Sequence, residues 1–123
     1  MSTNIFKIKT NELKDFLDYN SSDKLIVFYK QDCLFCKIQI DDIQNIAPKY
    51  QDKMNFAICD VTSKTKFCIE NDIIGLPTIH IYSKNKLVYS NRSYIDSNKL
   101  ENKIKELSWT VDPKMVTVKK ESS

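Results

Sequence analysis

Two cysteines three positions apart are the side chains best suited to chemistry in this sequence. Cys33 and Cys36 enclose Leu34 and Phe35, and they follow an apolar run at residues 25–29 after a three-residue loop. A continuous apolar run flanked by polar residues is typical of a strand that is buried on both faces. The position directly after such a strand predicts that Cys33 begins a helix, with Cys36 one turn further along the same side.

This placement gives the two sulfur atoms different roles. The first turn of a helix presents unpaired N–H groups and the positive end of the helix dipole, and both stabilise a thiolate at Cys33. The spacing also allows the two sulfurs to form a disulfide. We therefore expect Cys33 to be the nucleophile. We expect Cys36 to be the resolving thiol, which attacks the mixed disulfide that Cys33 forms with a substrate.

The other two cysteines allow a different interpretation, a zinc site. A Cys-x-x-Cys pair also binds zinc, and Cys59 and Cys68 would then be the further ligands. Eight residues separate Cys59 from Cys68, which is not a usual zinc-knuckle spacing, so we expect both to be small buried hydrophobic residues. A second, regulatory disulfide between them is the lesser alternative. His80 is expected to have a structural or surface role and not a catalytic or metal-binding one. Apart from the redox-active cysteine pair, no cofactor and no metal are expected.

The surrounding pattern predicts strands and helices in alternation. Apolar residues recur with helical spacing after Cys33, and they alternate as in a strand after Pro77. Helices between successive strands favour right-handed parallel crossovers, and the last two strands form a hairpin. We therefore expect one mixed sheet with helices on both faces, in the order β-α-β-α-β-α-β-β-α. The strands are expected at 6–8, 25–29, 55–61, 78–82 and 87–90, and the helices at 11–19, 33–50, 63–71 and 96–107.

Three segments carry a resemblance to a known family. They are Val27–Tyr29, Cys33–Lys37 and Gly75–Thr78, and their separations match those of thioredoxins. The sequence from Phe6 to Leu107 resembles the thioredoxin family. The resemblance implies the thioredoxin fold, an α/β fold with a central mixed β-sheet flanked by helices.

The resemblance also implies a substrate-binding surface. In the family, the peptide bond before the proline of the second motif is cis, and the proline packs beside the active-site sulfurs. Carried over to this chain, that bond is Leu76–Pro77. The backbone before Pro77 would then pair with an extended substrate segment. The substrate-binding residues expected from the resemblance are Leu34, Phe35, Leu76, Pro77 and Ser93.

The implied activity is thiol–disulfide exchange. The resemblance implies reduction of protein disulfides through a Cys33/Cys36 dithiol–disulfide cycle, with electrons from an external donor such as a reductase. Leu34 and Phe35 stand where thioredoxins usually have Gly-Pro and disulfide isomerases Gly-His, so a protein-disulfide isomerase or oxidase is an alternative. A non-catalytic binding module that holds a partner on the Pro77 surface is a third hypothesis.

The sequence departs from the family at positions near this surface and in the interior. Ser93 replaces a glycine that usually flanks the substrate, and Tyr29 and Asp32 replace tryptophans. Val27 and Ile58 take the places of a buried aspartate and a nearby lysine. A lone buried carboxylate is costly, so the joint loss of both charges is physically coherent.

Length and composition are those of one compact domain. The chain has 123 residues and a formal net charge of +3 from 19 basic and 16 acidic side chains that are mixed along it. We expect a domain at 1–109 and a flexible tail at 110–123. Because the net charge is small, we expect no nucleic-acid partner. No apolar run is long enough to span a membrane, so we expect no membrane partner. The N-terminal residues lack a signal-peptide pattern, so we expect a cytoplasmic protein, and we expect it to be a monomer.

Overall fold

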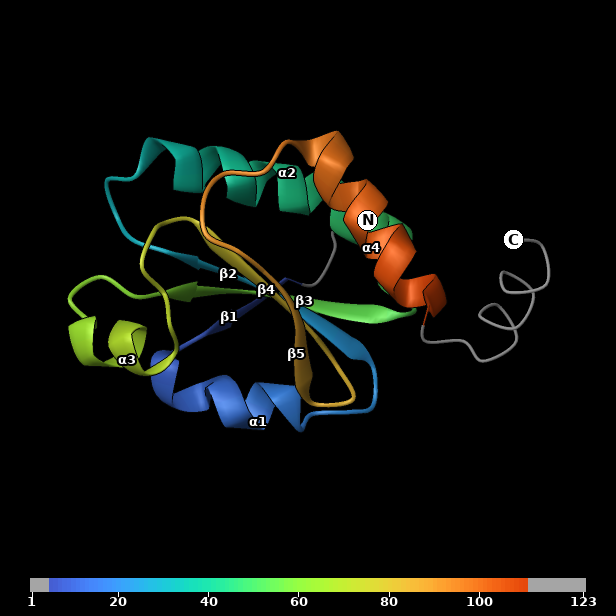
Figure 1. Ribbon diagram of the computed structural model, residues 1–123, viewed down its shortest axis with the longest axis horizontal. Coiled ribbons are helices and arrows are strands. Elements are labelled where there is room, and N and C mark those ends of the chain that lie inside the picture. Colours follow the sequence, from blue (N-terminus) through green and yellow to red (C-terminus); the bar gives the residue numbers. More distant parts are fainter. Residues whose placement is uncertain (1–4, 111–123) are drawn as a thin grey trace.

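A five-stranded mixed sheet forms the centre of the molecule (Figure 1). The computed structural model describes the backbone of residues 5–110 and the side chains of residues 5–107; of the tail predicted at 110–123, residues 111–123 lie outside this range. The strand order is β1-β3-β2-β4-β5, with β1, β2 and β3 parallel and β4 and β5 antiparallel to their neighbours. The predicted mixed sheet is confirmed. Its strands are β1 (Ile5–Ile8), β2 (Asp23–Tyr29), β3 (Met54–Asp60), β4 (Thr78–Ser83) and β5 (Lys86–Asn91).

Helices cover both faces of this sheet. In Figure 1, α2 and α4 lie over one face, and α1 and α3 lie over the other. Each face is packed with its own apolar cluster, one centred on Val27 and the other on Phe28. Among the described residues, no helix is both long and apolar enough to cross a membrane. The helices are α1 (Leu13–Leu17), α2 (Leu34–Tyr50), α3 (Thr65–Glu70) and α4 (Ser97–Thr110).

Strand β2 lies in the middle of the sheet, as its apolar run predicts. Leu25, Ile26, Val27 and Phe28 are all fully buried, so both faces of the strand are covered. Because β2 pairs with β3 on one side and β4 on the other, its carboxyl end is held rigidly. The segment that contains Cys33 follows directly from that end.

The first helix is the element that differs most from the prediction. In place of one helix over 11–19, a 3₁₀ turn spans Thr10–Glu12 and α1 ends at Leu17. The backbone N–H of Lys9 donates to Glu12 Oε1 at 2.7 Å, so the side chain of Glu12 completes the start of the turn. A tight 3₁₀ turn at a helix start is common, and apolar periodicity does not reveal it.

Candidate active site

Cys33 lies at the N-cap of α2, outside the helix itself. Its backbone is extended, with φ −116° and ψ 109°, and the backbone N–H of Cys36 donates to Cys33 Sγ at 3.2 Å. Capping by a sulfur in this position places the helix N–H groups and the positive dipole end at Cys33. When the pair is reduced, this environment favours negative charge on the Cys33 sulfur.

Cys33 and Cys36 form a disulfide, with 5.2 Å between their Cα atoms. Cys36 is fully buried, whereas Cys33 is only half-buried. Of the two sulfurs, the one at Cys33 is therefore the more accessible to a second molecule. This arrangement permits a dithiol–disulfide cycle within one turn of helix.

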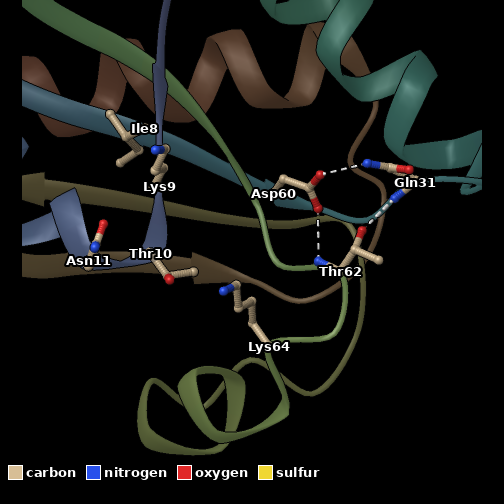
Figure 2. A pocket seen from close by; sticks show the side chains of 8 residues that line it. All are labelled: Ile8, Lys9, Thr10, Asn11, Gln31, Asp60, Thr62 and Lys64. Carbon is tan, nitrogen blue, oxygen red and sulfur yellow. Dashed lines mark hydrogen bonds between the residues drawn. The ribbon is translucent and has the colours of Figure 1, made fainter.

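The loop that carries Cys33 is tied to the neighbouring loop after β3. The backbone N–H of Gln31 donates to Thr62 Oγ1 at 2.9 Å, and Gln31 Nε2 donates to Asp60 Oδ2 at 3.2 Å. Asp60 Oδ1 accepts the backbone N–H of Thr62 at 2.8 Å (Figure 2). Hydrogen bonds from Thr62 hold the pKa of Asp60 below its usual value. The hydrogen bonds among Gln31, Asp60 and Thr62 thus hold the loop between β2 and Cys33 in position.

A second segment, before β4, lies opposite the cysteine. Cys33, Gly75 and Leu76 line one hollow of about 270 Å³. The Leu76–Pro77 peptide bond is cis, and Pro77 is buried. Gly75 is the only glycine in the chain, and a Cβ atom there would lie 2.6 Å from the carbonyl oxygen of Arg92. Only glycine therefore allows the loops before β4 and after β5 to approach so closely.

The part of the rim that Leu34 and Phe35 form next to the disulfide is apolar. Leu34 and Phe35 are exposed by 68% and 56%, and the Phe35 ring lies 5.8 Å from that of Tyr94. Ser93 is exposed and directly follows Arg92, whose carbonyl lies against Gly75. The structure thus places the predicted surface residues on three separate segments, at 34–35, 76–77 and 93.

Five residues that were not predicted as site residues also line the hollow beside Cys33. They are Lys30, Cys68, Ile73, Ile74 and Gly75. Lys30 directly follows β2 and is close to Cys33 in the sequence. This closeness could have been used to predict that Lys30 lies beside the site. Cys68 comes from α3, and neither spacing nor periodicity indicates that α3 borders the hollow. Ile74 is 72% exposed, which gives the hollow an apolar edge.

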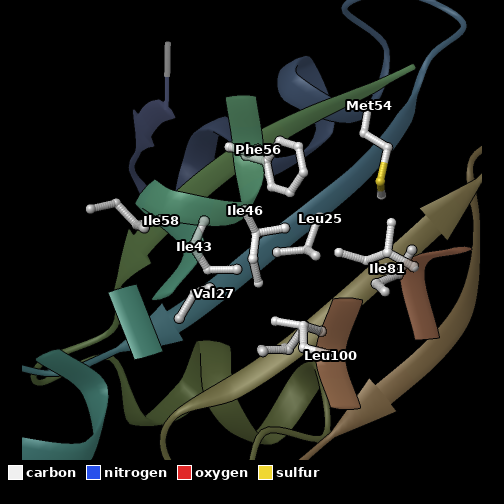
Figure 3. Packing of buried hydrophobic residues seen from close by; sticks show 12 residues of the cluster. Leu25, Val27, Ile43, Ile46, Met54, Phe56, Ile58, Ile81 and Leu100 are labelled. Carbon is white, nitrogen blue, oxygen red and sulfur yellow. The ribbon is translucent and has the colours of Figure 1, made fainter. Parts of the chain in front are cut away.

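The interior beneath α2 contains no charge at the two positions where the family has a pair. Val27 and Ile58 are Cα partners on adjacent strands, and both belong to an entirely apolar cluster (Figure 3). Their exposed fractions are 0% and 8%. The expectation that the two aliphatic residues take the place of buried charges together agrees with this packing.

Cys59 and Cys68 are free thiols near the second apolar cluster. Cys59 is fully buried, and burial raises its pKa to about 11; burial also raises the pKa of Cys68. His80 is 2% exposed and contacts the Phe28 ring edge-on, with burial lowering its pKa to about 4. Among residues 5–107, no three histidine, cysteine or acidic side chains are grouped so that they could hold a metal ion.

Comparison with known proteins places this site in a family context. Over 58 residues, the chain is 33% identical to a thioredoxin of Peptoclostridium acidaminophilum and covers 53% of that protein. It is 34% identical to a thioredoxin of Acetoanaerobium sticklandii over 58 residues, 55% of that protein. Each match covers 47% of this chain. The chain thus spans about half the length of the curated relatives it matches.

Solved structures agree on the fold, and the family model gives the wider match. Mitochondrial thioredoxin 3 of Saccharomyces cerevisiae has a TM-score of 0.71 at 22% identity, over 83% of this chain and 94% of that one. Chloroplastic thioredoxin z has a TM-score of 0.75 at 16% identity, over 86% and 96%. The thioredoxin family model matches residues 4–106. With that match over most of its length and a Cys-x-x-Cys disulfide at the start of α2, this protein belongs to the thioredoxin family.

Proposed function

We propose that this protein reduces disulfides in other proteins through Cys33 and Cys36. The observation that carries the proposal is the disulfide at the N-cap of α2, with one half-buried and one fully buried sulfur. Cys33 is the nucleophile because it is the accessible sulfur and has the helix N–H groups around it. Cys36 is the resolving thiol. The hollow beside Cys33 and the apolar rim receive the substrate, through Leu34, Phe35, Leu76, Pro77 and Ser93.

The cycle transfers two electrons and two protons from the dithiol to the substrate. The Cys33 thiolate attacks one sulfur of the substrate disulfide, forms a mixed disulfide and releases the first substrate thiolate. Cys36 then loses its proton and attacks Cys33 Sγ, which restores the Cys33–Cys36 disulfide and releases the second substrate thiolate. The two released thiolates take up protons. An external dithiol donor, in the cell a reductase, returns the protein to the reduced form.

The setting of this activity is also part of the proposal. Cys59 and Cys68 remain free thiols, as is usual in a reducing compartment, and we place the protein in the cytoplasm. The match of the family at residues 4–106 supports a single catalytic domain over 1–109. We propose that this domain acts as a monomer. No metal or external cofactor takes part in the cycle, because the cysteine pair itself carries the electrons.

An insulin-reduction assay with dithiothreitol as donor tests the activity. The wild-type protein should accelerate insulin precipitation, and Cys33→Ser should be inactive. A folded wild-type protein without activity would instead favour a binding module. Equilibration with glutathione redox buffers then gives the reduction potential. A potential close to that of reducing thioredoxins supports the proposed direction, whereas one close to that of oxidases would assign the protein to disulfide formation.

A further inference from the structure

The hollow beside Cys33 contains one charged side chain, that of Lys30. The other residues that line it are uncharged: Cys33, Cys68, Ile73, Ile74, Gly75 and Leu76. Lys30 is exposed, and no ion pair or hydrogen bond of its ammonium group occurs among the described residues. A substrate side chain that enters this hollow therefore meets aliphatic walls and one available positive charge.

A larger hollow of about 600 Å³ is lined by Gln31, the residue that follows Lys30 (Figure 2). Lys9 comes from the end of β1 and Lys64 from the start of α3, and Figure 2 shows the Lys64 side chain extending towards Thr10. The only acidic residue lining this hollow is Asp60, and both of its oxygens already accept hydrogen bonds from Thr62 and Gln31. Neither lysine forms an ion pair among the described residues, although the charge of Lys64 contributes to the lowered pKa of Asp60.

The two hollows are both lined by the loop between β2 and Cys33 and by residues at or in α3. Lys30 lines the first and Gln31 the second, so the loop before Cys33 runs between them. On the other side, Lys64 caps α3, and the backbone N–H of Cys68 donates to the Lys64 carbonyl at 3.0 Å. An extended segment that passes Cys33 can therefore contact both hollows.

The topology of the sheet also favours binding here. The chain leaves β2 towards α2 on one face and leaves β3 towards α3 on the opposite face (Figure 1). In open α/β sheets, ligands bind outside the carboxyl ends of the strands at such a point of divergence. Asp32 carries a negative charge in the same loop, but it lines neither hollow.

We propose that Lys9, Lys30 and Lys64 form a basic margin along the α3 side of Cys33, and that this margin selects protein substrates with acidic residues around the reacting cysteine. The inference rests on the proposed function, because it names the substrate class of that same site. Opposite charges raise the rate of encounter and exclude partners of like charge, without changing the chemistry at sulfur.

The test uses peptides that carry one cysteine in a disulfide with thionitrobenzoate. In three otherwise identical peptides, the residues on both sides of the cysteine are Glu, Gln or Lys. The second-order rate constant for reduction by the pre-reduced protein is measured for each. We expect the Glu peptide to react about two- to fivefold faster than the Gln peptide and the Lys peptide to react slower than both, since exposed charge pairs contribute modestly. High salt should remove the differences.

Two charge-matched variants locate the effect. The triple variant Lys9→Glu/Lys30→Glu/Lys64→Glu should prefer the Lys peptide. The control Lys84→Glu/Lys99→Glu/Lys105→Glu makes the same change in net charge at other exposed lysines and should retain the wild-type order. Ratios between peptides are compared, so that a general effect of Lys30 on Cys33 reactivity cancels. If the Glu variant does not fold, Lys9→Gln/Lys30→Gln/Lys64→Gln should react equally with all three peptides.

The outcomes separate this inference from the proposed function. Equal rates for the three peptides with wild type would overturn the inference while the reduction itself still stands. An unchanged order in the margin variant, or a reversed order in the control, would also overturn it. If the wild-type protein reduces no peptide at all, including the Gln peptide, the proposed function fails.

Discussion

At the scale of single residues, the apolar pair Val27 and Ile58 sets this protein apart from family members with two buried charges. The two residues are partners across β2 and β3 and pack in a cluster that contains only apolar side chains. An ionised group placed there loses its hydration and finds no opposite charge. The interior at this point is therefore expected to tolerate a charged pair better than a single charge.

The Val27→Asp variant tests this expectation. It should lose on the order of 3 kcal/mol of unfolding free energy, because the buried carboxylate has no partner. Adding Ile58→Lys should recover part of the loss, since the two positions are Cα partners. The control Val88→Asp, at a side chain exposed by 44%, should change stability little. Urea denaturation of the four proteins measures this, and a Val27→Asp variant as stable as wild type would show that the site is not a dry apolar pocket.

His80 gives a second residue-scale prediction, on the pH dependence of stability. Burial lowers its folded pKa to about 4 from the usual 6.5, so the unfolded chain takes up the proton first as pH falls. Stability is therefore complete above pH 6.5 and is lost as the pH falls towards 4. Between about pH 7 and about pH 4.5, this effect should cost on the order of 2 kcal/mol.

The variant His80→Phe isolates that contribution. Phenylalanine keeps the aromatic contact with Phe28 but has no proton to bind. Its unfolding free energy should therefore fall less over the same pH interval than that of wild type, as measured by urea denaturation at both pH values. An equal fall in the two proteins would mean that groups other than His80 account for the acid sensitivity in this interval.

At the scale of elements, Gln39 joins α2 to the segment before α4. It is fully buried, its Nε2 donates to the Ile95 carbonyl at 3.0 Å, and its Oε1 accepts the Ile95 N–H at 2.9 Å. Because Gln39 lies one turn after Cys36, this link holds the active-site helix against the chain that leads into α4.

Gln39→Ala should separate the two elements. Both backbone groups of Ile95 lose their partners, and the expected cost is about 2 kcal/mol of unfolding free energy. The control Gln44→Ala, at an exposed position of the same helix, removes a similar side chain and should cost much less. Hydrogen exchange of the Ile95 amide should also become faster in Gln39→Ala only. Equal stability of the two variants would refute the structural role of this link.

Most elements follow from local pattern, and the exceptions have physical causes. The run at 25–29 predicts a central strand because only a strand covered on both faces is apolar throughout. The first helix is shorter than its periodicity suggests because the chain turns at Asn20–Ser22 to enter β2. There the buried ammonium of Lys24 donates to the Asn20 carbonyl at 3.0 Å and to its Oδ1 at 2.9 Å, a tertiary arrangement that no spacing rule reveals.

At the scale of the whole molecule, the site combines segments far apart in the sequence. The cysteine pair was predictable because its spacing and its place after a buried strand are local features. The contribution of Lys30, Cys68 and Ile74 to one hollow was not, because it depends on how α3 and the loop before β4 pack beside the end of β2. The close approach of Gly75 to Arg92 likewise depends on tertiary packing.

Trapping of a mixed disulfide tests the proposed roles of the two cysteines, in which the accessible Cys33 attacks the substrate and the buried Cys36 releases it. The Cys36→Ser variant, mixed with a peptide disulfide, should accumulate a covalent adduct through Cys33 that mass spectrometry detects under non-reducing conditions. Cys33→Ser should form no adduct, because the remaining sulfur at Cys36 is fully buried. A stable adduct on Cys33→Ser, and none on Cys36→Ser, would contradict the assignment of both cysteines.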